Sequence, residues 1–172
     1  MKNQYRKAMQ ALYIACIALS GVALVAITLM IPAGVFMRYV MNDPLQWPEP
    51  ASVIMMVFFS FVGGAAAYRA NAQIAVEALV RAVAPPVRTA MHWGVHACMI
   101  AIAAFMFGYG VILCRTTWGN SMAEFPSLSV GIVYMPIPLG GLLTLLFIAE
   151  KIWLGDPPKS DFMYSDQPAE LE

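Results

Sequence analysis

Two histidines are the residues best suited to bind a metal ion or haem. His92 and His96 are the only histidines in the chain, and on a helix their spacing of four residues would put both side chains on one face. Haem held by two histidines needs ligands from facing helices, and no acidic or cysteine residue stands at a metal-ligand spacing from this pair. We therefore predict a polar pair near the membrane surface and no cofactor, with a metal site as the alternative.

The three cysteines give no sign of redox or metal chemistry. Cys16, Cys98 and Cys114 are scattered through apolar stretches and form no CxxC motif. We interpret them as small apolar residues that fill space between helices.

Carboxylates that could couple ion movement to transport are missing from the middle of every uncharged stretch. Glu49, Glu124 and Glu150 all lie at the edges of such stretches, whereas a self-contained coupled transporter needs an ionisable residue inside the membrane. The sequence also lacks a phosphate-binding loop and a nucleophile–base pair. We predict that the chain is not an enzyme and serves as a scaffold.

The composition is that of a membrane protein. Hydrophobic residues make up 60% of the 172 residues and charged residues 12%, against about 25% charged residues in a soluble domain. Ten basic and ten acidic residues balance to zero net charge, which argues against a nucleic-acid partner. The expected surroundings are the lipid bilayer.

Four long uncharged stretches predict an all-α membrane protein with four transmembrane helices. A helix needs about 20 residues to cross a hydrocarbon core of about 30 Å, and each stretch is close to that length or longer. The backbone must form helices there because lipid offers it no hydrogen-bond partners. The predicted spans are residues 8–37, 50–68, 89–114 and 128–151.

The segment between the second and third spans has a different pattern. Along residues 72–84, apolar side chains fall on one side of a helical wheel and polar ones on the other. We predict a short amphipathic helix there, either in the cytoplasmic membrane interface or packed on the protein. The membrane domain is predicted to cover residues 1–154, followed by a polar, disordered cytoplasmic tail, residues 155–172.

The basic residues predict the orientation in a bacterial inner membrane. If the N-terminus is cytoplasmic, eight of the ten basic residues lie on the cytoplasmic side and two, Arg38 and Arg115, on the outer side. Cytoplasmic loops carry such an excess of lysine and arginine. Both termini are therefore expected in the cytoplasm.

Small residues in the second and fourth spans predict close helix packing. Small side chains let helix backbones approach one another in a membrane. The candidate packing residues are Ser60, Gly63, Gly64, Ala67, Gly140 and Gly141.

A series of short motifs occurs in a characteristic order along almost the whole chain. The motifs are Arg38-Tyr39, Pro44 and Trp47-Pro48-Glu49 after the first span, Gly63-Gly64 and Tyr68-Arg69 closing the second, Gln73-Ile74 and Val76-Glu77 after it, Trp118 after the third, and Tyr134, Pro138 and Gly140-Gly141 in the fourth. With these motifs the chain resembles the small membrane (DctQ-type) subunit of tripartite ATP-independent periplasmic (TRAP) transporters. It departs from the family pattern at Pro50, Gln73 and Ser129, where the family often has an acidic residue, histidine and proline.

The resemblance implies a role in organic-acid uptake driven by an ion gradient, expected to be sodium. The implied partners are a large membrane subunit that moves substrate and ions, and a periplasmic substrate-binding protein. This chain would be the scaffold of the large subunit. The alternative from another class is a membrane anchor subunit of a respiratory complex.

The loop after the first span is the candidate periplasmic interface. Arg38, Tyr39, Trp47 and Glu49 combine charges with aromatic residues typical of membrane interfaces. These residues either only fix the loop in the headgroup layer or also dock the binding protein or the large subunit.

Overall fold

The computed structural model describes residues 2–43, 45–70 and 85–154. The predicted amphipathic helix, residues 72–84, and the predicted tail, residues 155–172, lie outside this part of the chain. The described elements are all helices: α1 (Lys2–Tyr39), α2 (Pro48–Arg69), α4 (Pro85–Thr117), α5 (Val130–Tyr134) and α6 (Pro136–Leu154).

Within residues 2–43, 45–70 and 85–154, four helical segments are long and apolar enough to cross a membrane, which agrees with the predicted number of spans. Their bounds are Gln4–Tyr39, Pro48–Arg69, Trp93–Thr117 and Val130–Trp153. Helix α1 has 38 residues and is therefore about 57 Å long at 1.5 Å per residue. Because the hydrocarbon core is about 30 Å thick, α1 must tilt or extend beyond it.

Helix α2 begins two residues earlier than the predicted span. Pro48 and Pro50 both fall in its first turn, where the missing N–H of proline has no intrahelical partner to lose. Glu49 is consequently part of the first turn rather than of the preceding loop.

The fourth span is divided at Met135 and Pro136. Ser129 caps α5 by accepting a hydrogen bond from the Gly131 backbone N–H, with Oγ and N 3.2 Å apart. At the junction the Met135 N–H donates to the Ile132 carbonyl, a tighter three-residue turn. The cause is Pro136, which has no N–H to continue the regular α-helical pattern.

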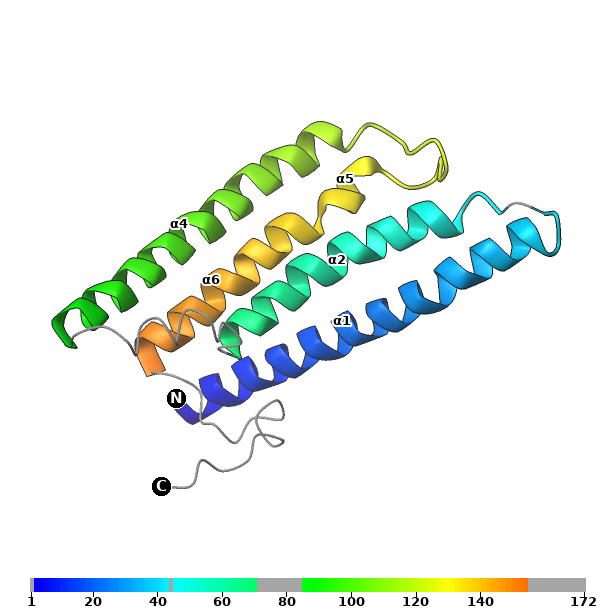
Figure 1. Ribbon diagram of the computed structural model, residues 1–172. Helices are drawn as coiled ribbons and strands as arrows, with labels where there is room; N and C mark the ends of the chain where they lie inside the picture. The colour runs from blue at the N-terminus through cyan, green and yellow to red at the C-terminus, as the bar shows by residue number, and fades with distance from the viewer. Residues whose placement is uncertain (1, 44, 71–84, 155–172) are drawn as a thin grey trace, which may run out of the picture.

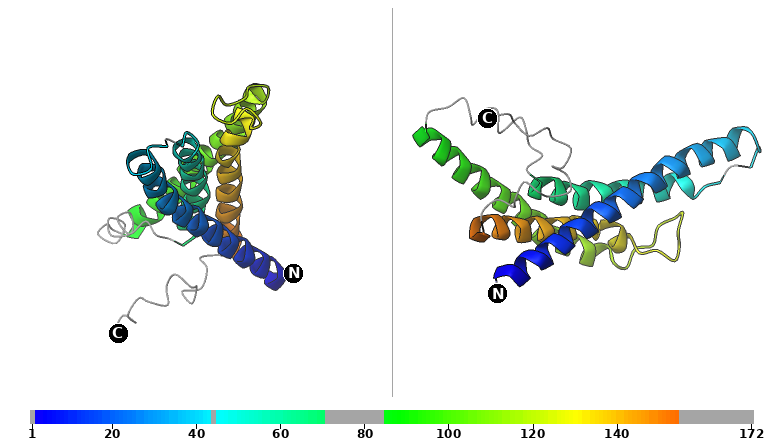
Figure 2. Two further views of the ribbon diagram at one scale, coloured as in Figure 1. Left: turned by 90° about the vertical axis from the view of Figure 1, so that its right-hand side faces the viewer. Right: turned by 90° about the horizontal axis from the view of Figure 1, so that it is seen from below.

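The helices form an open row rather than a closed bundle. Helix α1 packs on α2, α2 on α6, and α6 on α4 (Figure 1). Further views show that α1 crosses its neighbours obliquely (Figure 2). Along the length of the helices, the end that holds the first and last described residues is called the terminal end. The other, called the loop end, holds the connections after α1 and after α4.

Helix α6 lies between α2 and α4, and two adjacent glycines let both neighbours come close. A Cβ added at Gly140 would lie 2.8 Å from the Cβ of Phe61 on α2, and one at Gly141 would lie 2.8 Å from the Phe107 nitrogen on α4. Both distances are too short for real side chains, so α2 and α4 approach α6 only because these positions are glycine.

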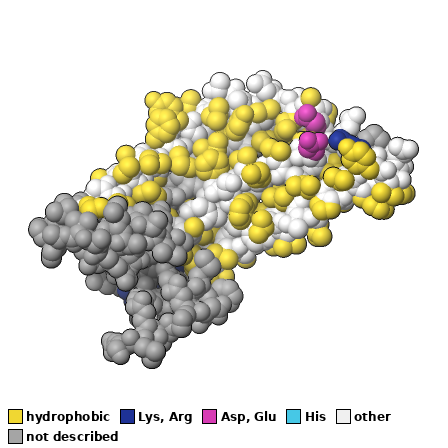
Figure 3. Space-filling model, in the orientation of Figure 1, with side chains coloured by type: hydrophobic (Ala, Val, Ile, Leu, Met, Phe, Trp, Pro, Cys, Tyr) yellow, Lys and Arg dark blue, Asp and Glu magenta, His cyan; other side chains and the backbone are white. Residues whose placement is uncertain are grey.

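Little of the apolar surface is covered within the chain itself. The fully buried side chains gather around α2 and α6, Val62, Phe147 and Ile148 among them. Large apolar side chains remain exposed on all four spans, and Figure 3 shows them across the described part of one face. In a membrane this surface faces lipid or another protein.

Candidate functional site

A buried ion pair joins the terminal ends of α2 and α6. Arg69 donates from Nε to Oε2 of Glu150 at 2.7 Å and from Nη2 to Oε1 at 2.9 Å. The two side chains are only 1% and 4% exposed. This two-pronged geometry is the strong arrangement for a guanidinium and a carboxylate, because both oxygens of the acid are used.

Helix α1 completes the surroundings of Arg69. Nη1 of Arg69 donates to Oε1 of Gln10 on α1 at 3.2 Å. The guanidinium carbon lies 4.7 Å from the ring centre of Tyr13 on α1 and 5.7 Å from that of Phe147 on α6. The charge is therefore held by hydrogen bonds and by aromatic faces that attract cations.

A second set of polar contacts extends to α4. Lys151 donates from Nζ to the Tyr68 carbonyl at 2.8 Å and lies 4.3 Å from the centre of the Tyr68 ring. The Tyr68 hydroxyl shares a hydrogen bond of 3.3 Å with Nδ1 of His96. His96 thus belongs to a polar network, while the side chain of His92 lies outside the described part of the chain.

These residues are called the terminal cluster, and they tie all four spans together. Its members are Gln10, Tyr68, Arg69, His96, Glu150 and Lys151. Removing one partner of a buried ion pair costs about 3–5 kcal/mol, because the other charge is left buried without compensation. The cluster therefore fixes how the helices sit against one another.

The sequence patterns do not predict this cluster. In the sequence, Arg69 indicates the orientation and Glu150 lies at the edge of an uncharged stretch. One signal was present: Tyr68-Arg69 and Glu150-Lys151 end two spans on the same side of the membrane with opposite charges. Opposite charges at equal depth can pair when their helices are neighbours.

The predicted loop residues lie together at the loop end but make a much weaker contact. Arg38 Nη2 and Glu49 Oε2 are 3.9 Å apart, and the two side chains are 54% and 82% exposed. Tyr39 and Trp47 are exposed as well. The four side chains stand at the surface, where lipid headgroups or a partner protein can reach them.

The predicted packing residues of α2 divide between two environments. A Cβ added at Gly63 would lie 3.3 Å from Ser20 Oγ on α1, so this position is in close contact. Gly64 has no atom within 4 Å of such a Cβ among the described residues, and Ser60 is exposed. Ala67 is half-buried. Gly63 therefore faces α1, whereas Ser60 and Gly64 face outward.

Taken together, four apolar helices and a buried polar cluster define a multi-pass membrane protein. Residues 27–156 match the family of tripartite ATP-independent periplasmic transporters, DctQ component. The match covers more than half of the chain, so the chain belongs to this family and is a small subunit of a TRAP transporter. A comparison with curated protein sequences gave no match. The matched region contains both arginine–glutamate pairs.

Proposed function

We propose that this chain is the stationary scaffold of a TRAP-type uptake system in the bacterial inner membrane. In this proposal a large membrane subunit carries the organic acid and sodium, a periplasmic protein delivers the acid, and the present chain holds the large subunit in place. Membership of a transporter component family supports this role over that of a respiratory anchor.

The observation that carries the proposal is the state of the acidic residues in the four candidate spans. These spans contain Glu49, exposed in the first turn of α2, and Glu150, bound by Arg69 at both oxygens. A carboxylate that coordinates a coupling ion must exchange its ligands during each cycle. Glu150 already has a charged, buried partner, which suits a fixed structural role.

The open row of helices supports the same role. The main contacts join neighbours in the row, α1 with α2, α2 with α6 and α6 with α4, and large apolar side chains remain exposed on all four spans. An open row with exposed apolar surface can widen the membrane-embedded surface of a partner.

Reconstitution tests the proposal. Liposomes receive this chain, the large subunit or both, with a sodium gradient and the purified binding protein loaded with an organic acid. Uptake is expected only with both membrane subunits. Concentrative uptake by this chain alone would contradict the scaffold role.

The orientation has a separate test on a cysteine-free background. We expect a cysteine introduced at Asp43 or Ser121 to react with an impermeant thiol reagent from the periplasm. One introduced at Lys159 should react only after the membrane is opened. The reverse pattern would place both termini outside the cytoplasm.

A further inference from the structure

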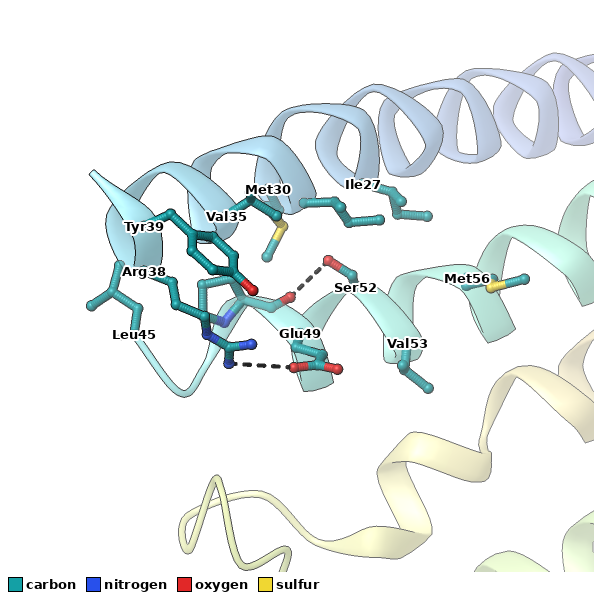
Figure 4. A pocket seen from close by; sticks show the side chains of 13 residues that line it. Ile27, Met30, Val35, Arg38, Tyr39, Leu45, Glu49, Ser52, Val53 and Met56 are labelled. Atoms are coloured by element: carbon teal, nitrogen blue, oxygen red, sulfur yellow. Dashed lines mark hydrogen bonds and ion pairs between the residues drawn. The ribbon is translucent and has the colours of Figure 1, made fainter. Parts of the chain in front are cut away.

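An apolar groove lies between α1 and α2 at their loop ends. Its volume is about 360 Å³, which is within the range of about 300–1,000 Å³ of small-molecule sites. Ile27, Ile31 and Val35 line it from α1, and Val53 and Met56 from α2. Figure 4 shows Arg38 and Glu49 side by side at one end of the groove.

The helices meet beneath the groove and leave its walls apolar. A Cβ added at Gly34 on α1 would lie 3.3 Å from Pro48 on α2, so the two backbones are close there. The Ser52 hydroxyl donates to the Pro48 carbonyl at 2.7 Å, so the hydroxyl of this wall residue has its hydrogen-bond partner within α2. Val35, Val53 and Met56 are all more than half exposed. The walls thus offer an acyl chain a dry, hydrocarbon-like surface.

The charges at the rim have capacity to bind a ligand. Arg38 and Glu49 approach to only 3.9 Å and are largely exposed, so most donors of the guanidinium and most lone pairs of the carboxylate face outward. Arg38 ends an uncharged run of thirty residues that begins at Ala8, and its guanidinium therefore belongs at the depth of lipid headgroups. The rim presents a cation and an anion next to each other at that depth.

We propose that this groove binds one phospholipid of the phosphatidylethanolamine type. The phosphate accepts hydrogen bonds from Arg38, the primary ammonium donates to Glu49, and one acyl chain lies along the apolar walls. The rim presents one cation and one anion side by side, which complements the two opposite charges of this headgroup. Phosphatidylglycerol supplies the phosphate but no ammonium, and Glu49 would repel its net negative charge.

Native mass spectrometry of the full chain in detergent micelles tests the site. Phosphatidylethanolamine and phosphatidylglycerol are added separately at equal concentrations. We expect one bound phosphatidylethanolamine, favoured over phosphatidylglycerol by about 1.4- to fivefold, the range of one exposed ion pair. Glu49→Gln should remove the preference, Arg38→Ala should weaken binding of both lipids, and Val53→Trp should block the groove.

A second groove at the loop end provides the matched control. It has a volume of about 420 Å³ and is lined by Arg115 and Trp118 together with apolar residues, but by no carboxylate. Arg115→Ala should leave the lipid preference unchanged. Equal binding of the two lipids to the wild-type chain would overturn the proposal, as would a preference that survives Glu49→Gln or is lost with Arg115→Ala.

The complex with the large subunit separates a lipid site from a protein interface. The bound phosphatidylethanolamine should persist, with the same dependence on Glu49, when the two membrane subunits are purified together. Loss of the lipid on assembly would mean that the large subunit occupies the groove, and would overturn the proposal for the working transporter.

Discussion

Helix α2 carries one member of an arginine–glutamate pair at each end, and the two pairs differ in almost every physical respect. At the loop end, Glu49 and Arg38 approach to 3.9 Å with side chains 82% and 54% exposed. At the terminal end, Arg69 and Glu150 form two hydrogen bonds with almost no exposed surface. The same residue types thus form an accessible surface at the loop end and a buried contact between α2 and α6 at the terminal end.

Burial decides the difference. When an exposed pair forms, hydrogen bonds to water are replaced by contacts of similar strength, and the pair adds only about 0–1 kcal/mol to the free energy of unfolding. Its charged groups therefore remain available to a ligand. A buried pair contributes little net stability over apolar replacements, yet the loss of one partner is costly. The terminal pair therefore fixes which helices are neighbours, whereas the loop pair leaves recognition possible.

The largest expected effect follows from breaking the buried pair. Arg69→Ala leaves the Glu150 carboxylate buried without its cation, and we expect the free energy of unfolding to fall by about 3–5 kcal/mol. Unfolding of the purified chain in mixed micelles titrated with SDS measures the change. Arg38→Ala, at the loop end, is the matched control. Equal losses for the two variants would contradict the comparison.

The contact between α2 and α6 at Gly140 should be the next most sensitive. Gly140→Leu places a side chain where even a Cβ would lie 2.8 Å from Phe61, and overpacking of this kind costs about 1–3 kcal/mol. Gly64→Leu is the control, because no atom of the described residues lies within 4 Å of a Cβ added there. We expect Gly64→Leu to change the stability of the isolated chain by no more than about 0.5 kcal/mol.

Gly64→Leu also reports on the partner. If the outward face of α2 meets the large subunit, this variant should co-purify with it less well while the isolated chain stays folded. Normal co-purification would show that this face contacts lipid.

Exchanging the buried charges sharpens the comparison. In Arg69→Glu/Glu150→Arg, the pair is restored in reverse, and we expect an interaction energy of about 0.5–3 kcal/mol in a double-mutant cycle with the single variants. Recovery should be partial, because Gln10 and the Tyr13 and Phe147 rings are arranged around the original arginine. Strict additivity of the single changes would mean that the two side chains do not interact.

A much smaller effect on stability than at the buried pair is expected at the loop pair. Glu49→Lys should change the free energy of unfolding by less than about 1 kcal/mol. If the loop also docks the binding protein, the half-saturation concentration for that protein should rise while the maximal uptake rate is kept. Unchanged kinetics at normal assembly would leave the loop without a docking role.

The four spans could be predicted because lipid imposes a simple rule on the sequence. A helix that crosses hydrocarbon excludes charge over about 20 residues, and this exclusion is visible without any knowledge of neighbours. The motif order likewise indicated the family, which the match over residues 27–156 confirms.

The arrangement of those helices could not be predicted in the same way. Nothing in the spacing of Arg69 and Glu150, which lie 81 positions apart, says that α2 and α6 are neighbours. The small-residue pattern likewise did not distinguish Gly63, which faces α1, from the adjacent Gly64, which is open. Helix neighbours depend on pairwise packing between distant segments, and local periodicity carries no information about it.

The scaffold role is tested most sharply at Glu150, because this role requires a carboxylate that is structural and not ion-coupling. Glu150→Gln is assembled with the proposed large subunit, and uptake is measured per assembled complex over a range of sodium concentrations. We predict less assembled complex, with an unchanged rate per complex and an unchanged sodium dependence. Normal assembly with lost or sodium-independent uptake would contradict the scaffold role, because Glu150 would then take part in coupling.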